Sequence, residues 1–310
     1  MPMDLIQILK GRIESLDEGP YTGGLRAVLQ HVQVAANHLR RGADVPDDSA
    51  FTDTIYRTNQ AFEGSLKEAY RVLAGQDPDK ARPYDIETFL QRQGLLRTRV
   101  LEQMSRYRTE WRNPSTHDYK LDFDEDEALL AIVSVCAFAV VLIDQIAEKV
   151  SFNRAKAVAS APPPSGKPFV DLVVDSLLAL DLRSSNRGAT PRVHESHLIG
   201  AIAGHLEATL PHDASVTIDA PIGDGHFRAD LIVELKGEKV LLEIKLTRSA
   251  HNLRGVAISQ LSRYIATSGI RQAILAMFDD GLEGLERRDH ELPGIDARII
   301  ILAPPKRNAA

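Results

Sequence analysis

A proline-rich segment divides this chain. Residues 161–168 contain four prolines in eight residues. Proline fixes one backbone angle and has no amide donor, so this segment joins no regular element and forms a fairly stiff spacer. A length of 310 residues also predicts about two domains at roughly 150 residues each. We therefore expect a domain over residues 1–158, a linker over 159–168 and a second domain over 169–310.

The sequence before the spacer has helical periodicity. Apolar residues recur every three or four positions over residues 5–13 and 25–39, and longer helical stretches cover about 51–73, 85–112 and 124–150. No alternating strand pattern occurs there, which predicts an all-α antiparallel helix bundle. Within it, the run Ala128–Ile143 is hydrophobic nearly all round. At 16 residues it is short for a membrane span, and it predicts a fully buried helix, covered by the bundle or by a second copy of the chain.

The sequence after the spacer mixes helices with strands. Helices are expected at about 169–182, 193–210 and 253–266. Strands are expected at 216–222, 226–235, 239–246, 272–278 and 297–302, with a short helix before the last of them. A tight turn at residues 236–238 joins the second strand to the third. The core order α-β-β-β-α-β predicts an α/β domain with a mixed sheet and helices packed against it.

Composition narrows the class of protein. Apolar residues make up 44% and charged residues 26%, which excludes a disordered or collagen-like chain. The single cysteine, Cys136, forms no internal disulfide, and the first residues do not resemble a signal peptide, so we expect a cytoplasmic protein with no membrane association. Net charge is −6, and neither half has a basic excess. Nucleic-acid binding would therefore depend on local patches or on bound metal ions.

Two acids and a lysine lie on neighbouring predicted strands. Glu243 and Lys245 are two residues apart and so point to the same face, and the hairpin brings Asp230 beside them. Charges within such apolar strands need a compensating partner, because burying unpaired charge is costly. Divalent cations bind carboxylate oxygens, water and phosphate oxygens. A neighbouring lysine can orient or deprotonate an attacking water.

Residues 190–303 resemble the PD-(D/E)xK nuclease superfamily, which has the restriction-endonuclease-like fold. Asp230, Glu243 and Lys245 match its metal-binding acids and catalytic lysine, and Ala229 replaces the family's proline. The resemblance implies Mg²⁺ or Mn²⁺ as cofactor. It also implies that Glu195, which opens the preceding helix, is the extra acid found in many members. Gln260 and Tyr264 match the Gln-x-x-x-Tyr element of the RecB-like branch, which implies contact with nucleic acid at the same site.

Each of these residues also has a structural interpretation. Glu243 and Lys245 form a simple ion pair in one alternative, since Asp/Glu-x-Lys also occurs at residues 118–120 and 234–236. Tyr264 is then a core residue, Gln260 a surface residue, and Glu195 an acid favoured at a helix N-terminus by the helix dipole.

A polar loop is expected between the two long helices at the end of the first domain. Pro114 disfavours helical geometry at Asn113, so the helix is expected to end there, in a tight turn that holds Arg112 and His117. The Arg-x4-His spacing alone is weak, because it also occurs at residues 26–31 and 192–197.

With this motif, residues 20–150 resemble HEPN domains, helical bundles of which many are endoribonucleases. The resemblance implies a homodimer with a metal-independent RNase site formed by Arg112 and His117, with Asn113 supplying a hydrogen bond. Arginine binds phosphate in a bidentate manner, and histidine transfers protons near neutral pH. Arg97 and Arg108 would extend a phosphate-facing stripe. In the alternative, this stripe is a solvated helix face, Arg112 pairs with a nearby acid such as Asp118, and His117 caps a helix.

These features predict a two-module nuclease. The second domain would hydrolyse DNA with a metal ion, and the dimeric first domain would cleave RNA, as in prokaryotic defence effectors. One alternative is a binding module that grips nucleic acid without cutting it and uses the bundle to dimerise or recruit partners. In another, only the bundle is catalytic, as an RNase toxin, and the second domain senses nucleic acid.

Overall fold

The computed structural model describes residues 4–45, 47, 49–117, 122–159, 166–182, 194–247, 253–279, 284–292 and 296–305. The chain separates into two compact units, residues 1–147 and 148–310, which we call the helical unit and the sheet unit. This division falls within one helix, α7 (Glu125–Val158), ahead of the predicted linker. Residues 160–165 of that linker lie outside the described residues. A helical part followed by a mixed sheet confirms the predicted fold class at this level.

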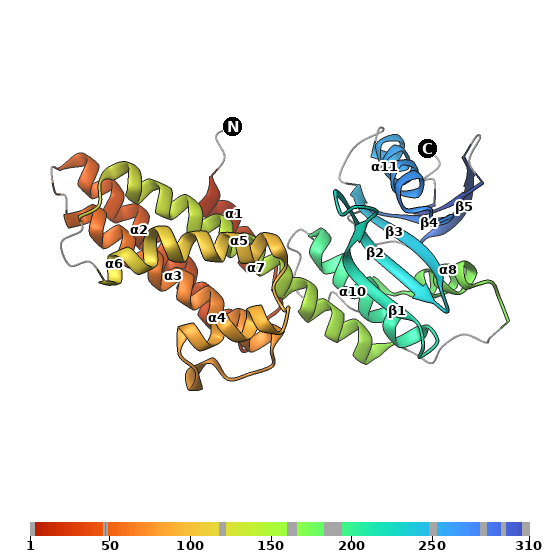
Figure 1. Ribbon diagram of the computed structural model, residues 1–310, viewed down its shortest axis with the longest axis horizontal. Coiled ribbons are helices and arrows are strands. Elements are labelled where there is room, and N and C mark those ends of the chain that lie inside the picture. The colour runs from red at the N-terminus through yellow and green to blue at the C-terminus, as the bar shows by residue number, and fades with distance from the viewer. Residues whose placement is uncertain are drawn as a thin grey trace. The chain divides into compact units, whose positions relative to one another are not determined.

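The helical unit is built from helices alone in its described residues (Figure 1). These are α1 (Leu5–Glu14), α2 (Thr22–Asp44), α3 (Ser49–Leu73), a short 3₁₀ helix (Pro78–Lys80), α4 (Pro83–Arg92), α5 (Thr98–Tyr107), a π-helical turn (Arg108–Arg112), α6 (Asn113–His117) and most of α7. Phe62 of α3 lies at the centre of the core. Its ring stacks on Tyr107 at a centroid distance of 4.7 Å and meets Phe138 of α7 at 5.0 Å.

The single helix predicted over residues 85–112 is wrong, because the chain breaks after α4. Gly94 adopts φ +62°, which places it in the left-handed region that glycine tolerates. The amide of Leu95 donates to the carbonyl of Leu90, and that of Gly94 to Gln91, which closes the end of α4. Arg97 is the N-cap residue of α5 and Arg108 begins the π-helical turn after it, so the three arginines do not lie on one regular helix, as the predicted stripe required.

The predicted helix end at Asn113 is also wrong. Asn113 has helical angles, and its amide donates to the carbonyl of Arg108, five residues earlier, before the chain continues as α6 through Pro114. A π-helical turn is wider than an α-helical one, which moves the preceding carbonyls away from the proline ring and makes its missing amide tolerable. Arg112 and Asn113 therefore lie on a distorted helix and not in a tight turn.

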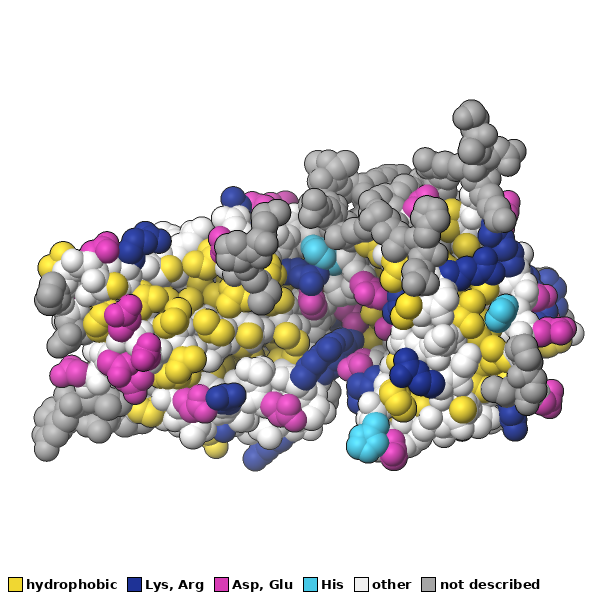
Figure 2. All heavy atoms as spheres, turned by 90° about the horizontal axis from the view of Figure 1, so that it is seen from above, with side chains coloured by type: hydrophobic (Ala, Val, Ile, Leu, Met, Phe, Trp, Pro, Cys, Tyr) yellow, Lys and Arg dark blue, Asp and Glu magenta, His cyan; other side chains and the backbone are white. Residues whose placement is uncertain are grey.

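Helix α7 is apolar, but the bundle of one chain does not cover it fully, so burial by a second copy of the chain is the alternative that stays a prediction. A reciprocal hydrogen bond between Asp124 and Glu127 caps its start. Leu129, Leu130 and Val133 are exposed at 48%, 54% and 39%. Figure 2 shows hydrophobic side chains gathered on one face of the helical unit. Among the described residues, α7 is also the one helix long and apolar enough to cross a membrane; 56% of its most apolar window is buried, and core helices of soluble proteins meet the same criterion.

The sheet unit contains a six-stranded mixed sheet in the order β1-β2-β3-β4-β6-β5. Its elements are α8 (Phe169–Ala179), α10 (Glu195–Thr209), β1 (Ser215–Ile222), β2 (Phe227–Leu235), β3 (Glu238–Thr247), α11 (Leu253–Ser268), β4 (Gln272–Asp279), β5 (Glu286–Glu291) and β6 (Arg298–Ala303). Strands β1, β2 and β3 form an antiparallel meander, β3–β4 and β4–β6 are parallel, and β5 is antiparallel to β6. The predicted α-β-β-β-α-β order is confirmed, apart from an added strand.

That added strand, β5, replaces the short helix predicted before the last strand. Its six residues are all polar, so no apolar alternation marks them as a strand. Backbone pairing with β6 and ion pairs hold it instead: Arg287 pairs with Asp171 of α8 at 2.8 Å, and Arg298 of β6 pairs with Asp289 at 2.6 Å.

Two apolar clusters cover the sheet. The α10-side cluster joins the sheet to α8 and α10, and the α11-side cluster joins the other face to α11 (Figure 1). Helix α10 also packs closely on the last turns of α7. A Cβ atom added at Gly200 or Gly204 would lie 2.1 Å from the carbonyl oxygen of Glu148 or Phe152. These two glycines allow the two helix backbones to touch.

Candidate functional site

Strand β3 carries the predicted acid and lysine on one face. Leu242 and Ile244 enter the α10-side cluster, whereas Leu241 enters the α11-side cluster. Because side chains alternate along a strand, Glu243 and Lys245 share the face of Leu241, toward α11. The ammonium Nζ of Lys245 donates to Glu243 Oε1 at 2.6 Å.

Glu243 is the buried centre of the site. Its side chain is 2% exposed, and Oε1 accepts a second hydrogen bond from Gln260 Nε2 at 2.8 Å. The other oxygen, Oε2, is buried and has no hydrogen-bond partner among the described residues. Burial raises the pKa of Glu243, although the Lys245 ammonium opposes this effect. A buried carboxylate oxygen without a partner is costly, so it indicates a group that completes the site.

Asp230 approaches the same place from β2. Its Oδ2 accepts a hydrogen bond from the backbone amide of Ile244 at 2.7 Å. Burial, reinforced by the charge of Glu243, raises the pKa of Asp230 to about 7. Two carboxylates thus lie together in a poorly solvated site, and the ammonium group of Lys245 partly neutralises them.

The remaining predicted residues of the sheet unit lie around this pair. Glu195 Oε1, at the start of α10, is 3.7 Å from Lys245 Nζ. Gln260 Nε2 donates to the hydroxyl of Tyr264 at 2.5 Å. Tyr264 also packs against Phe227 of β2, with ring centroids 5.8 Å apart. The predicted site residues of two helices, α10 and α11, and two strands, β2 and β3, are therefore brought together. Gln260 and Tyr264 are predicted nucleic-acid contacts; in this structure Gln260 donates hydrogen bonds to both Glu243 and the hydroxyl of Tyr264.

The donor set fits a hard divalent cation. Magnesium is usually bound through one or two carboxylates, with water and substrate phosphate completing its octahedron. Asp230 and Glu243 supply two carboxylates, and Glu243 Oε2 is buried without a partner in the described part of the chain. The described residues contain no group of three or more His, Cys, Asp or Glu side chains placed to hold a metal. A cation here would therefore rely on water and substrate for its other ligands.

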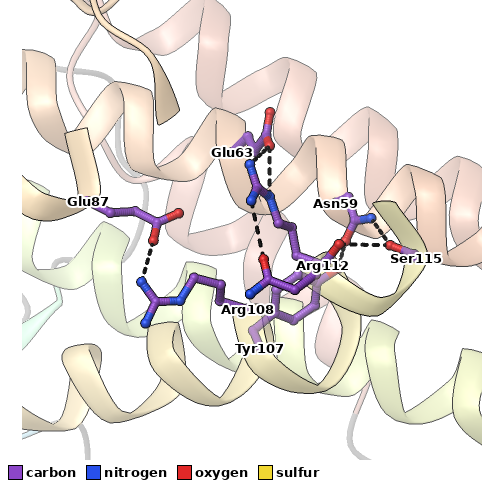
Figure 3. A network of polar contacts seen from close by, with 8 residues as sticks. Asn59, Glu63, Glu87, Tyr107, Arg108, Arg112 and Ser115 are labelled. Carbon is purple, nitrogen blue, oxygen red and sulfur yellow. Dashed lines mark hydrogen bonds and ion pairs between the residues drawn. The ribbon is translucent and has the colours of Figure 1, made fainter. Parts of the chain in front are cut away.

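The second predicted constellation lies in the helical unit and is part of a polar network (Figure 3). Arg112 Nε and Nη2 donate to Glu63 Oε1 at 3.4 Å, and Nη1 donates to Asn113 Oδ1 at 3.3 Å. The structure thus joins Arg112 to Asn113. The side chain of His117 lies outside the described residues, so its predicted place in the site stays a prediction.

Three members of this network, Asn59, Tyr107 and Ser115, had no signal in the sequence. Asn59 of α3 accepts a hydrogen bond from the Tyr107 hydroxyl at 3.0 Å and donates to Ser115 Oγ at 2.8 Å. Glu63 lies one helical turn further along α3. These contacts span about 50 positions, and no local pattern in one sequence links them. Arg108 pairs with the buried Glu87 at 3.0 Å, so the second arginine of the predicted stripe also binds a carboxylate.

Comparison with known proteins identifies no relative of this chain. No protein-family model, no curated protein and no solved structure matches the chain.

Proposed function

We propose that the sheet unit is a nuclease of the PD-(D/E)xK type that hydrolyses phosphodiester bonds, with DNA as its substrate. The observation that carries this proposal is the buried Glu243 Oε2, which has no partner among the described residues although Asp230 lies beside it and Lys245 faces the same pocket. A purely structural ion pair gains nothing from a buried carboxylate oxygen without a partner, which is costly. The strand and helix order around the site supports the same fold.

Each residue has a defined part in the proposed reaction. Asp230 and Glu243 would hold Mg²⁺ or Mn²⁺, with Glu195 as a further candidate ligand. The bound ion would polarise the scissile phosphate and lower the pKa of a water molecule. Gln260 fixes Glu243 through its side-chain amide, and Tyr264 fixes Gln260 in turn. The Lys245 ammonium lies on the same face, where it orients the attacking water and stabilises negative charge that develops on the phosphate.

Plasmid cleavage tests this proposal. Supercoiled plasmid should be nicked or cut with Mg²⁺ and left intact with EDTA. Glu243→Gln and Lys245→Ala should each reduce the rate by at least about 100-fold. The matched control is Glu234→Gln, which alters the other Glu-x-Lys of the same hairpin. Cleavage that survives EDTA, or that Glu243→Gln leaves at the wild-type rate, would exclude the metal mechanism.

A second activity is proposed for the helical unit, as a dimeric HEPN-type RNase that uses Arg112, Asn113 and His117. The supporting observation is that Glu63 and Asn113 hold the guanidinium of Arg112, which is 23% exposed, at a π-helical turn, a distortion frequent at functional sites. RNA cleavage should persist in EDTA and disappear in Arg112→Ala and His117→Ala. The control is Arg106→Gln, an exposed arginine of α5 paired with Glu110. Equal loss in the control would contradict the assignment.

The proposed dimer would use the exposed apolar residues of α7, Leu129, Leu130 and Val133. The proposed setting is the cytoplasm of a prokaryote, in a defence role. The rival function is a binding module that grips nucleic acid without cutting it. Such a module has no need for a buried carboxylate, that of Asp230, whose pKa burial and the neighbouring charge of Glu243 raise, which is why we prefer the nuclease.

A further inference from the structure

Strands β1 and β2 change the face that they present to the core. In β1, Val216 and Ile218 pack in the α10-side cluster, whereas Ile222 belongs to the α11-side cluster. Regular alternation would place these even-numbered residues on one face. In β2, Leu231 enters the α10-side cluster and Ala229, two residues earlier, the α11-side cluster. Both strands therefore switch faces over the same short stretch.

The switch is centred on Asp219 and Asp230. Ile218 pairs with Leu231, and Ala220 pairs with Ala229, so Asp219 and Asp230 form the intervening step, which is missing from the regular pairing. Asp219 has φ +51°, in the left-handed region that L residues rarely adopt. Such a residue within a strand turns the backbone and redirects the side chains that follow, as a bulge does.

Arg228 holds this conformation from the neighbouring strand. Its Nε donates to Asp219 Oδ1 at 2.8 Å, and its Nη2 donates to the backbone carbonyl of Asp219. One guanidinium therefore holds both the side chain and the main chain of the residue with the strained angle. Aspartate suits this position, because a short polar side chain that accepts local hydrogen bonds makes the left-handed region accessible.

The switch explains how Asp230 reaches its partner. Side chains of a regular strand stand roughly perpendicular to the sheet, out of reach of backbone amides on the next strand. The pairing of β2 with β3 ends at Leu231–Leu242, and beyond it the amide of Ile244 donates to the carboxylate of Asp230. The change of face thus turns Asp230 toward β3 and the pocket of Glu243.

We propose that Asp219 is a positioning residue for the metal-binding carboxylate of Asp230, acting through its left-handed backbone. The effect on catalysis rests on the proposed function, whereas the effect on the position of Asp230 does not. Asp219 itself touches neither the metal nor the substrate in this scheme.

Four variants test the proposal. Asp219→Val introduces a β-branched residue that strongly disfavours φ +51°, whereas Asp219→Gly and Asp219→Asn keep the angle accessible. The matched control is Lys236→Val, because Lys236 has φ +50° in the β2–β3 turn, at the far end of β2. The first readout is hydrogen exchange of the Ile244 amide in metal-free protein, which reports whether Asp230 still accepts that hydrogen bond. The second is the Mg²⁺-dependent kcat and KM for plasmid.

The left-handed conformation lowers the population of an ordinary residue by roughly tenfold. Asp219→Val should therefore speed Ile244 exchange about tenfold relative to Lys236→Val and lower kcat by a similar factor, with KM unchanged. Asp219→Gly and Asp219→Asn should stay within about threefold of wild type. Should Asp219→Val fail to fold, Arg228→Gln, which releases the clamp without a steric clash, should give the same two effects at smaller amplitude.

Two results would overturn the proposal. The first is a rate of hydrogen exchange at the Ile244 amide that is no faster in Asp219→Val than in Lys236→Val. If Asp219→Val does not fold, the same comparison is made with Arg228→Gln. The second is an equal loss of Ile244 protection and of kcat in Asp219→Gly and Asp219→Val. The carboxylate of Asp219, and not its left-handed backbone, would then position Asp230. A wild-type protein that cuts no plasmid would refute the proposed function alone, because exchange at Ile244 would still report the position of Asp230.

Discussion

Replacing Asp230 by asparagine should stabilise the metal-free sheet unit at alkaline pH. Asparagine keeps an oxygen that can accept the hydrogen bond from the Ile244 amide, so the change removes charge with little loss of geometry. Burial and the neighbouring Glu243 raise the pKa of Asp230 from 3.8 to about 7 in the folded state. Between these two pH values the folded protein holds a proton that the unfolded chain has released.

The sign and size of the effect follow from this difference. Since the folded state binds more protons, the free energy of unfolding of wild type falls as pH rises from about 4 to about 7. At about 1.4 kcal/mol for each pKa unit, the loss approaches about 4 kcal/mol by pH 8. Asp230→Asn lacks this loss, so it should match wild type near pH 4 and exceed its stability at pH 8.

Urea unfolding of each variant at pH 4.5 and pH 8, in EDTA, measures this difference. Far-ultraviolet circular dichroism follows the whole chain, while fluorescence of Trp111, the one tryptophan, reports the helical unit separately. Saturating Mg²⁺ should restore wild-type stability at pH 8 and leave Asp230→Asn unchanged. The control is Asp289→Asn. Slight burial opposes ionisation of Asp289, but Arg298 and Arg287 together lower its pKa, so loss of its charge should not stabilise. Parallel pH profiles for wild type and Asp230→Asn would refute the buried-carboxylate site.

Helix contact, surface apolarity and the Arg112 ion pair give further expectations. Gly200→Ala should lower the stability of the sheet unit by about 1–3 kcal/mol, because its Cβ meets a backbone carbonyl. Gly11→Ala, in open space on α1, should stabilise the helical unit by about 0.5–1 kcal/mol. Thermal unfolding measures both changes, and a change of stability in the same direction for both variants would contradict the packing. Leu130→Glu should weaken self-association at least about tenfold in sedimentation velocity, and an unchanged mass distribution would exclude this face as the dimer interface. Glu63→Gln should reduce EDTA-resistant RNA cleavage about tenfold by loosening Arg112 and spare plasmid cleavage; loss of both activities would indicate general unfolding.

Local rules predicted most elements of the fold. Periodicity located most of the helical segments before the spacer, although not the break at Gly94, and the five apolar strands after it, because each buries one face against a core. The prediction from periodicity failed for elements that are not stabilised by burying an apolar face. Strand β5 is held by backbone pairing and ion pairs, and its polar sequence carries no strand signal. The continuation through Pro114 depends on a π-helical turn, and the sequence pattern does not specify whether a chain widens or breaks there.

The candidate site was predictable to the extent that it follows strand geometry. Glu243 and Lys245 share a face because of the two-residue repeat, and a tight hairpin had to bring β2 beside them. Asp219 and Arg228 escaped prediction for a different reason. Their importance lies in a left-handed backbone angle and in a register step, and neither leaves a pattern in one sequence.

The two units differ in how their buried carboxylates are paired. This difference distinguishes a structural ion pair from a candidate binding site. In the helical unit, Arg108 neutralises the buried Glu87, so this pair needs no further group. In the sheet unit, Lys245 meets one oxygen of Glu243 and leaves the other unsatisfied, with a second carboxylate beside it. A fold that only needed an ion pair would gain stability by replacing Asp230 with a neutral residue. A charge kept at a cost in stability fits a cation-binding role, and it is the reason that we propose a catalytic site for the sheet unit before one for the helical unit.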